Sequence, residues 1–168
     1  MFFALWPDDE VRRALDRAGE SLLGKRVKRV TAANLHLTLA FAGPVTASVR
    51  HCLESAAGAI RVAPFELTLD HCGHWRRPRI AWMGPTHTPA DLWSLVGSLR
   101  TVFEVCGLQV ETRPYQPHVT LARKISRLAN DTAVTPVPWS IRSFSLVESV
   151  TGARGVSYQR LASWTLEG

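Results

Sequence analysis

Hydrophobic and polar residues alternate along this chain with a period that changes from segment to segment, and the changes predict its elements. Short apolar or alternating runs bounded by Gly or Pro indicate strands, whereas apolar residues recurring every three or four positions indicate helices. Strands are expected at residues 2–6, 34–41, 65–71, 79–84, 116–123, 139–150 and 156–166. Helices are expected at residues 8–24, 46–60 and 89–107, and a loop at residues 126–136.

The first and third helices have the clearest signals. Asp8 is a good N-cap, acidic residues follow it in the first turn, and Gly24 is a plausible C-terminal stop. In the third helix one side is apolar, and its predicted core residues are Leu92, Leu95, Val96, Leu99, Val102 and Phe103. Near the end of the chain, a turn at residues 152–155 should join the last two strands.

Two of the predicted strands share one motif. Residues 34–40 read NLHLTLA and residues 116–122 read QPHVTLA. Because side chains alternate between the faces of a strand, one face of the first copy carries a His and a Thr beside a small Ala, and the other face is apolar. The motif face should therefore hold His36, Thr38 and Ala40, with Leu37, Leu39 and Phe41 in the core; in the second copy it should hold His118, Thr120 and Ala122, opposite Val119 and Leu121.

A single His–Thr pair on a strand is usually a solvated edge pair. Two near-identical copies in the two halves of the chain instead indicate an internal duplication. A duplication brings like elements together across a pseudo-two-fold axis, so we expect two His and two Thr to point into one cleft.

Composition places the chain among ordinary globular proteins. The 168 residues are 46% hydrophobic and 20% charged, which suits a single domain over residues 1–168 built of two pseudo-repeated lobes. No apolar run is long enough to span a membrane, and the short apolar start lacks the basic lead of a signal peptide, so a cytoplasmic protein is expected. The cysteines, Cys52, Cys72 and Cys106, match no disulfide framework and are expected to be reduced and mostly buried.

The net charge of +6 favours an anionic partner. Most of the basic residues are Arg, whose guanidinium suits phosphate, although a GC-rich genome would give the same bias. The basic run from Lys25 to Arg29 is either a solvated surface or a patch for a nucleic-acid backbone.

Residues 71–78 (HCGHWRRP) combine several side chains with chemical potential. His71, Cys72 and His74 lack a fourth ligand at a recognised spacing, so no metal site is expected. Trp75 beside two arginines could stack a base and hold its phosphate; the alternative is a loop Trp that covers the core.

Two imidazoles that face one phosphorus atom form a general acid–base pair, because His titrates near neutral pH. The Thr hydroxyls on the same face can donate to non-bridging phosphate oxygens. No cofactor or metal is needed, since a cyclic phosphate diester is strained and carries one negative charge. Strict alternation puts Arg123 on the opposite face, so it must use a bulge or the strand end to reach the cleft; otherwise it is an exposed surface charge.

These motifs resemble the paired His-x-Thr-x signature of the 2H phosphoesterase superfamily, most closely its bacterial RNA 2′,3′-cyclic phosphodiesterase branch, also described as 2′-5′ RNA ligases. The resemblance covers nearly the whole chain. Besides the motifs it includes Phe2 to Ala4, Gly43, Cys72 to Trp75, Arg79 to Gly84 and Tyr158 to Trp164. The chain departs from the family in having almost no lead-in before the first strand.

The resemblance implies an α+β fold, duplicated into two lobes, with two antiparallel sheets lining a central cleft and helices outside. It implies hydrolysis of RNA 2′,3′-cyclic phosphate ends to 2′-phosphomonoesters, with reversible 2′-5′ ligation. The implied proton donor is His36 and the acceptor His118. Thr38 and Thr120 would bind the phosphate, with substrate contacts from Arg123, Trp75 and Tyr158.

The implied partner is RNA or an oligonucleotide with a cyclic phosphate end, bound by a monomer with no membrane partner. Two alternatives stay open. The same site could serve a small cyclic nucleotide or a 2′-5′ oligonucleotide, or it could be a non-catalytic module that binds RNA ends.

Overall fold

The computed structural model describes residues 1–128, 133–152 and 155–168. Its elements follow the order β1 (Phe2–Leu5), α1 (Asp9–Leu23), η1 (Ala32–Asn34), β2 (Leu37–Phe41), α2 (Ala47–Ala57), β3 (Phe65–Leu69), β4 (His71–Trp75), β5 (Ile80–Gly84), α3 (Ala90–Val105), β6 (Val119–Arg123), β7 (Val137–Ile141), β8 (Ser143–Gly152) and β9 (Gly155–Thr165). The predicted 152–155 turn includes residues 153–154, and the predicted loop includes residues 129–132; these lie outside the described residues.

The strands form a seven-stranded antiparallel sheet in the order β4-β5-β6-β2-β1-β8-β9, and a second sheet of β3 and β7. This confirms the α+β class with antiparallel sheets. The two motif strands, β2 and β6, are direct neighbours in the large sheet. The two copies of the motif therefore meet at the centre of one sheet.

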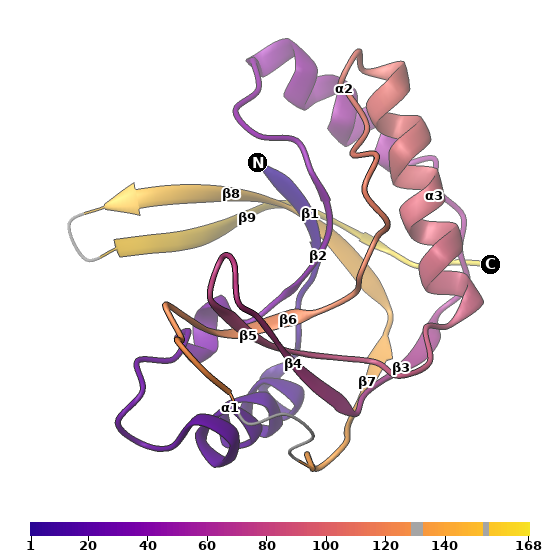
Figure 1. The fold of residues 1–168 in the computed structure, drawn as a ribbon. Coiled ribbons are helices and arrows are strands. Elements are labelled where there is room, and N and C mark those ends of the chain that lie inside the picture. The colour runs from indigo at the N-terminus through magenta and orange to yellow at the C-terminus, as the bar shows by residue number, and fades with distance from the viewer. Residues whose placement is uncertain (129–132, 153–154) are drawn as a thin grey trace.

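The helices pack against the sheets at two separate places (Figure 1). α2 and α3 pack side by side, with α3 against β2, whereas α1 packs against β6 and β7. The β8–β9 hairpin extends away from the body. In the described ranges, no helix combines the length and the apolar character that crossing a membrane requires.

The predicted helix signals are confirmed. The Asp8 side chain accepts hydrogen bonds from the backbone N–H groups of Glu10 and Val11, at 3.0 and 2.9 Å. Gly24 ends α1 with a φ of 77°, a conformation that suits Gly. All six residues predicted for the apolar side of α3 are buried, so the 3.6-residue period identified the correct face.

Two strand predictions are wrong. Residues 139–150 are not one strand, because the chain leaves the small sheet at Arg142 and joins the large sheet as β8. Residues 72–75 were not predicted as a strand, and His71 was assigned to the preceding one, yet residues 71–75 form β4 and pair with β5 from His71–Gly84 to Trp75–Ile80. Pairing overrides the local signal of Gly73, which is unfavourable within a strand.

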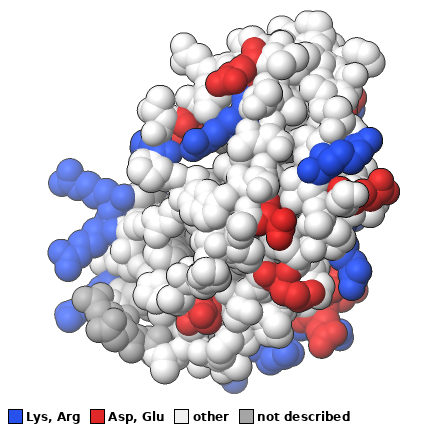
Figure 2. Space-filling model, turned by 90° about the vertical axis from the view of Figure 1, so that its right-hand side faces the viewer, with Lys and Arg blue, Asp and Glu red and all other residues white. Residues whose placement is uncertain are grey.

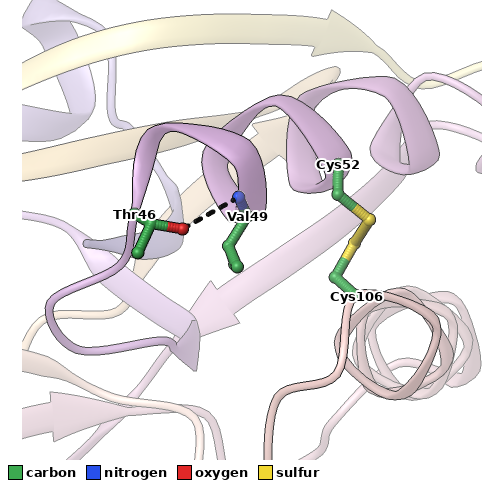
Figure 3. Close-up of a disulfide and its surroundings, with 4 residues drawn as sticks. All are labelled: Thr46, Val49, Cys52 and Cys106. Carbon is green, nitrogen blue, oxygen red and sulfur yellow. Dashed lines mark hydrogen bonds between the residues drawn. A yellow bond between two sulfur atoms is a disulfide. The ribbon is translucent and has the colours of Figure 1, made fainter.

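The expectation of three reduced cysteines is also wrong. Cys52 of α2 and Cys106, just after α3, form a disulfide that joins the two helices (Figure 3). Their Cα atoms lie 5.8 Å apart, within the range that a disulfide requires. Thr46 begins α2 as its N-cap by accepting a bond from the Val49 N–H. Cys72 is buried, as expected.

Candidate active site

The pairing of β2 with β6 brings the two motifs together. Leu37 lies opposite Val119 in an antiparallel pair. Continued by one residue each way, this register sets His36 opposite Thr120 and Thr38 opposite His118. Side chains directly opposite are about 5 Å apart at Cβ, and diagonal neighbours about 7–8 Å. The two histidines therefore occupy one diagonal of a square and the two threonines the other, on the side of the sheet that we call the motif face.

Both imidazoles are held in the same way. His36 Nδ1 lies 2.7 Å from the Asn34 carbonyl oxygen, and His118 Nδ1 lies 2.8 Å from that of Gln116. A carbonyl oxygen only accepts, so each Nδ1 carries a hydrogen and donates it. Each Nε2 is then left to take a proton when its ring is neutral, or to give one when its ring is charged.

Burial lowers the pKa of His36 below its usual 6.5, and the positive charges of Arg123 and His118 lower it further, while the bond to Asn34 opposes them. Burial likewise lowers the pKa of His118, helped by Arg123 and opposed by the bond to Gln116. Because each added proton disfavours the next, the pair resists double protonation. A state with one charged and one neutral imidazole is the state that acid–base catalysis uses.

A bulge in each motif strand changes which residues reach the motif face. Phe3 and Ala4 pair with Ala40 and Thr38, and Ala81 and Trp82 pair with Ala122 and Thr120. One extra residue, Leu39 or Leu121, is thus inserted at the same place in each motif. A bulge interrupts the alternation of faces.

Beyond the threonines, the predicted core positions of Leu39 and Leu121 are confirmed, whereas the predicted positions of the two alanines and of Phe41 are wrong. Ala40 packs on the main core and Ala122 is fully buried, rather than beside the histidines. Phe41, predicted to be in the core, is 69% exposed. Arg123 is also exposed, and its charge acts on both histidines. The bulge allows Arg123 to turn to the motif face. In the first motif, Phe41 occupies the equivalent position of the strand.

Aromatic rings pack around His36. Trp6 stacks on it with an interplanar angle of 4° and a centroid distance of 5.4 Å, and Tyr158 of β9 meets it edge-on at 4.8 Å. Phe2 lies 5.0 Å away. Asn34 Nδ2 donates to the Val156 carbonyl at 3.0 Å and so fastens the β8–β9 hairpin beside the site. Tyr158 was predicted from the sequence to contact substrate, whereas Trp6 and Phe2 were missed.

A different pair of rings borders His118. Trp75 meets it edge-on at 4.5 Å, and Trp82 of β5 lies 5.3 Å from Trp75. The Trp82 ring occupies the space where a side chain at Gly73 would stand. Trp75 is thus the last residue of strand β4 beside a motif histidine, and the interpretation of it as a loop residue over the core is wrong.

The missed residues left little trace in the sequence. Trp6 follows a predicted strand, and Trp82 lies inside another, where an aromatic residue usually indicates the core. Only the pairing of β5 with β6, Trp82 opposite Thr120, brings Trp82 near the motif. Neither Trp6 nor Trp82 is close to a motif copy in the sequence, so no local signal marked either residue.

Other candidates lie elsewhere. His74 Nε2 bonds the Ile125 carbonyl at 2.9 Å and His71 packs on Trp82. Across the described ranges no group of three or more His, Cys, Asp or Glu is placed to hold a metal ion. A cavity of about 310 Å³ lies between α1 and residues 133–137, and no motif His or Thr lines it. The candidate site is therefore identified by the chemistry of its side chains and not by the position of this cavity.

Comparison with known proteins agrees with this geometry. Residues 7–153 match the family model of the 2′-5′ RNA ligase superfamily. The chain is 35% identical to the RNA 2′,3′-cyclic phosphodiesterase of Escherichia coli, over 99% of this chain and 96% of the relative. It is 30% identical to the protein of that name from Thermus thermophilus, over 100% and 90% of the two chains.

Solved structures give the same answer. A crystal structure of a phosphoesterase matches with a TM-score of 0.92 and 32% identity, covering 99% of this chain and 97% of that one. E. coli LigT complexed with 3′-AMP matches with a TM-score of 0.89 and 34% identity, covering 98% and 96%. The chain belongs to the 2′-5′ RNA ligase superfamily, whose members are 2H phosphoesterases.

Proposed function

We propose that this protein is a metal-independent RNA 2′,3′-cyclic phosphodiesterase that opens the cyclic phosphate at an RNA end to leave a 2′-phosphomonoester. The observation that carries the proposal is the antiparallel β2–β6 pair, which sets two histidines with available Nε2 atoms on one diagonal of the motif face. The names of the full-length relatives and the 3′-AMP complex of LigT support an RNA end as substrate.

The proposed reaction uses each histidine once. Neutral His118 Nε2 takes a proton from a water molecule, whose oxygen attacks phosphorus. The bond between phosphorus and O3′ breaks, and protonated His36 Nε2 gives its proton to O3′. The 3′-hydroxyl and the 2′-phosphate are the products, and the two rings then exchange protons with solvent. The bound phosphate anion raises the pKa of His36 from its lowered value and so favours the charged ring before reaction.

Three further side chains hold the phosphate in this proposal. The Thr38 and Thr120 hydroxyls donate to its non-bridging oxygens, and among the described residues neither hydroxyl is engaged in another hydrogen bond. Arg123 adds a positive charge to balance the charge that develops in the transition state. Trp75, Tyr158 and Phe41 provide apolar surface for the nucleoside.

The acid–base roles are tested by His36→Ala and His118→Ala. Each variant should lower kcat on a 2′,3′-cyclic phosphate by about 10²–10⁴-fold with KM changed little, because acid–base groups act on the transition state. Retention of full turnover by both variants would rule the proposal out. Turnover that survives a chelator separates this enzyme from a metal-dependent phosphatase, and a bell-shaped pH–rate profile separates it from a binding module.

Ligation is a second candidate, favoured by the family's description as 2′-5′ RNA ligases. A 5′-hydroxyl end would replace water as the nucleophile: His118 takes its proton, the new P–O5′ bond forms as the P–O3′ bond breaks, His36 gives a proton to O3′, and a 2′-5′ linkage results. Offering 2′,3′-cyclic, 3′-5′-cyclic and 2′-5′-linked nucleotides in parallel, and identifying the products, distinguishes these activities from action on a small cyclic nucleotide. We further propose a monomer that acts in the cytoplasm, where RNA is turned over.

A further inference from the structure

Five exposed basic side chains adjoin the motif face and form what we call the basic strip. It consists of Arg76, Arg77 and Arg79 in the β4–β5 turn, and Arg123 and Lys124 at the end of β6. None of the five forms an ion pair with any residue in the described part of the chain. No Asp or Glu occurs in residues 71–84 or 117–128, so the elements that carry the strip supply no counter-charge.

The strip is held together by the backbone. Ile80 pairs with Arg123, which places Arg79 beside Lys124. The Arg79 N–H donates to the Trp75 carbonyl at 2.8 Å, and the Ile125 N–H donates to the Arg79 carbonyl at 3.0 Å. Arg79 and Lys124 have φ values of 66° and 63°, which are uncommon for side chains of this kind. The two positions therefore lie next to each other, where β5 begins and β6 ends.

The strip is continuous with the site at two points. Arg76 directly follows Trp75, whose ring contacts His118. Arg123 acts electrostatically on both histidines. A row of basic side chains that begins beside an aromatic ring suits a single-stranded nucleic acid, because its phosphates repeat along the strand and its bases stack on aromatic rings.

Other basic residues are arranged differently. Arg12, Arg29, Arg50 and Arg113 have acidic partners within 4 Å. On the face covered by α3, acidic and basic side chains are interspersed (Figure 2). Other exposed basic side chains, such as Arg100 and Arg142, also lack an ion pair with the residues that the structure describes. The strip is distinguished by the grouping of five such side chains beside Trp75 and the end of β6, on segments that contain no Asp or Glu.

We propose that the basic strip binds the backbone phosphates of the nucleotides that precede the cyclic end, so that the preferred substrate is an RNA oligonucleotide rather than a mononucleotide. This inference rests on the proposed function for the placement of the cyclic end at the two histidines. The strip selects the length of the substrate, whereas the histidines and threonines act on its terminal phosphate.

The test compares the double variant Arg76→Ala/Arg77→Ala with the control Arg100→Ala/Arg142→Ala, which removes the same charge from exposed positions in α3 and between β7 and β8. The strip variant should raise KM for a ten-nucleotide RNA with a 2′,3′-cyclic end by about tenfold, while KM for a 2′,3′-cyclic mononucleotide changes less than about twofold. The control should change neither. An equal rise for both substrates, or no rise for the RNA, overturns the inference while leaving the phosphodiesterase activity standing.

A binding measurement makes the inference independent of turnover. The same RNA with a 3′-phosphate end, labelled with a fluorophore, is titrated by anisotropy at several salt concentrations. The strip variant should bind more weakly and lower the slope of log K against log[salt] by about 1.4, since each single-strand phosphate contact contributes about 0.7. An unchanged slope overturns the inference even if no substrate is hydrolysed. Displacement of the bound RNA by poly-glutamate at equal total charge also overturns it.

Discussion

The two motif histidines have matching backbone contacts but different surroundings. Each donates from Nδ1 to the carbonyl oxygen two residues earlier. His36 is stacked on Trp6 and is sensitive to the charge on His118, whereas His118 is bordered edge-on by Trp75. The repeated motif therefore supplies two rings with the same backbone contact, and the residues around them make the two environments different, as the proposed acid and base roles require.

Arg123→Gln tests the electrostatics of this pair. Arg123 lowers the pKa of both histidines, so its removal should raise both toward 6.5. In kcat/KM against pH, the acidic limb reports the base and the alkaline limb the acid. The whole bell should therefore move to higher pH, with a lower maximum because a phosphate contact is lost. An unmoved bell, or one displaced to lower pH, would show that Arg123 does not act on the histidines; Arg100→Gln is the charge-matched control.

At the scale of elements, the matching bulges at Leu39 and Leu121 determine which side chain at the end of each motif strand reaches the motif face. In each copy an Ala follows the bulge. The residue after that Ala is Phe41 in the first copy and Arg123 in the second. A strict period of two buries Phe41 and turns Arg123 away, so the sequence alone misplaced Phe41 and could bring Arg123 to the motif face only through a bulge or the strand end. The bulge is set by pairing with β1 and β5, and those partners are not encoded locally.

Gly73→Ala tests how β4 and β5 shape the site. A methyl group at this position would overlap the Trp82 ring, which would have to move and would disturb its contact with Trp75. We expect a loss of about 1–3 kcal/mol in the free energy of unfolding, typical of overpacking, together with a raised KM. Gly97→Ala is the control, because nothing lies within 4 Å of its new methyl group. Equal unfolding midpoints in urea for the two variants would contradict the proposed fit.

The disulfide between α2 and Cys106 closes a loop with a sequence separation of 54. A cross-link of this span stabilises a protein by about 2–4 kcal/mol. Cys52→Ser/Cys106→Ser should therefore lower Tm by roughly 5–15 °C, without changing kcat, because the disulfide joins α2 to the end of α3 and not to either motif strand. A reductant should lower the Tm of the wild type and leave that of the variant unchanged. Equal wild-type values with and without reductant, or two alkylatable thiols at these positions in the isolated protein, would contradict the disulfide.

The parts of the fold that sequence could predict are those set by local period and by repetition. The apolar face of α3, the Asp8 cap and the pairing of two His-x-Thr strands all follow from residue spacing. The change of sheet at Arg142 and the partner of Cys52 depend on segments that are distant in sequence. Residues 139–150 look strand-like throughout, and the Cα separation that permits a disulfide exists only in the folded chain.

At the scale of the whole molecule, the site lies where the two halves of the large sheet join, at the single register pair Leu37–Val119. A partly buried tyrosine strengthens this junction, since the Tyr115 hydroxyl donates to the Thr38 carbonyl at 3.0 Å and ties the segment before β6 to β2. Burial also raises the pKa of Tyr115, which keeps its hydroxyl protonated as a donor. The geometry of the candidate site thus depends on the same contacts that hold the two halves of the large sheet together.

This placement makes the stability of the molecule depend on the protonation of its site. Both histidines have a folded-state pKa below 6.5, the value expected when unfolded. Above that pH both states are neutral and folding is unaffected. As the pH falls below 6.5 the unfolded chain binds protons first, so stability is lost until the folded-state pKa values are passed. His36→Ala/His118→Ala should therefore show a shallower loss of unfolding free energy between about pH 7 and pH 5 than the wild type. His51→Ala/His87→Ala, which removes two exposed histidines, should keep the wild-type slope. Parallel curves for all three proteins would mean that the fold holds these rings without the desolvation that lowers their pKa values.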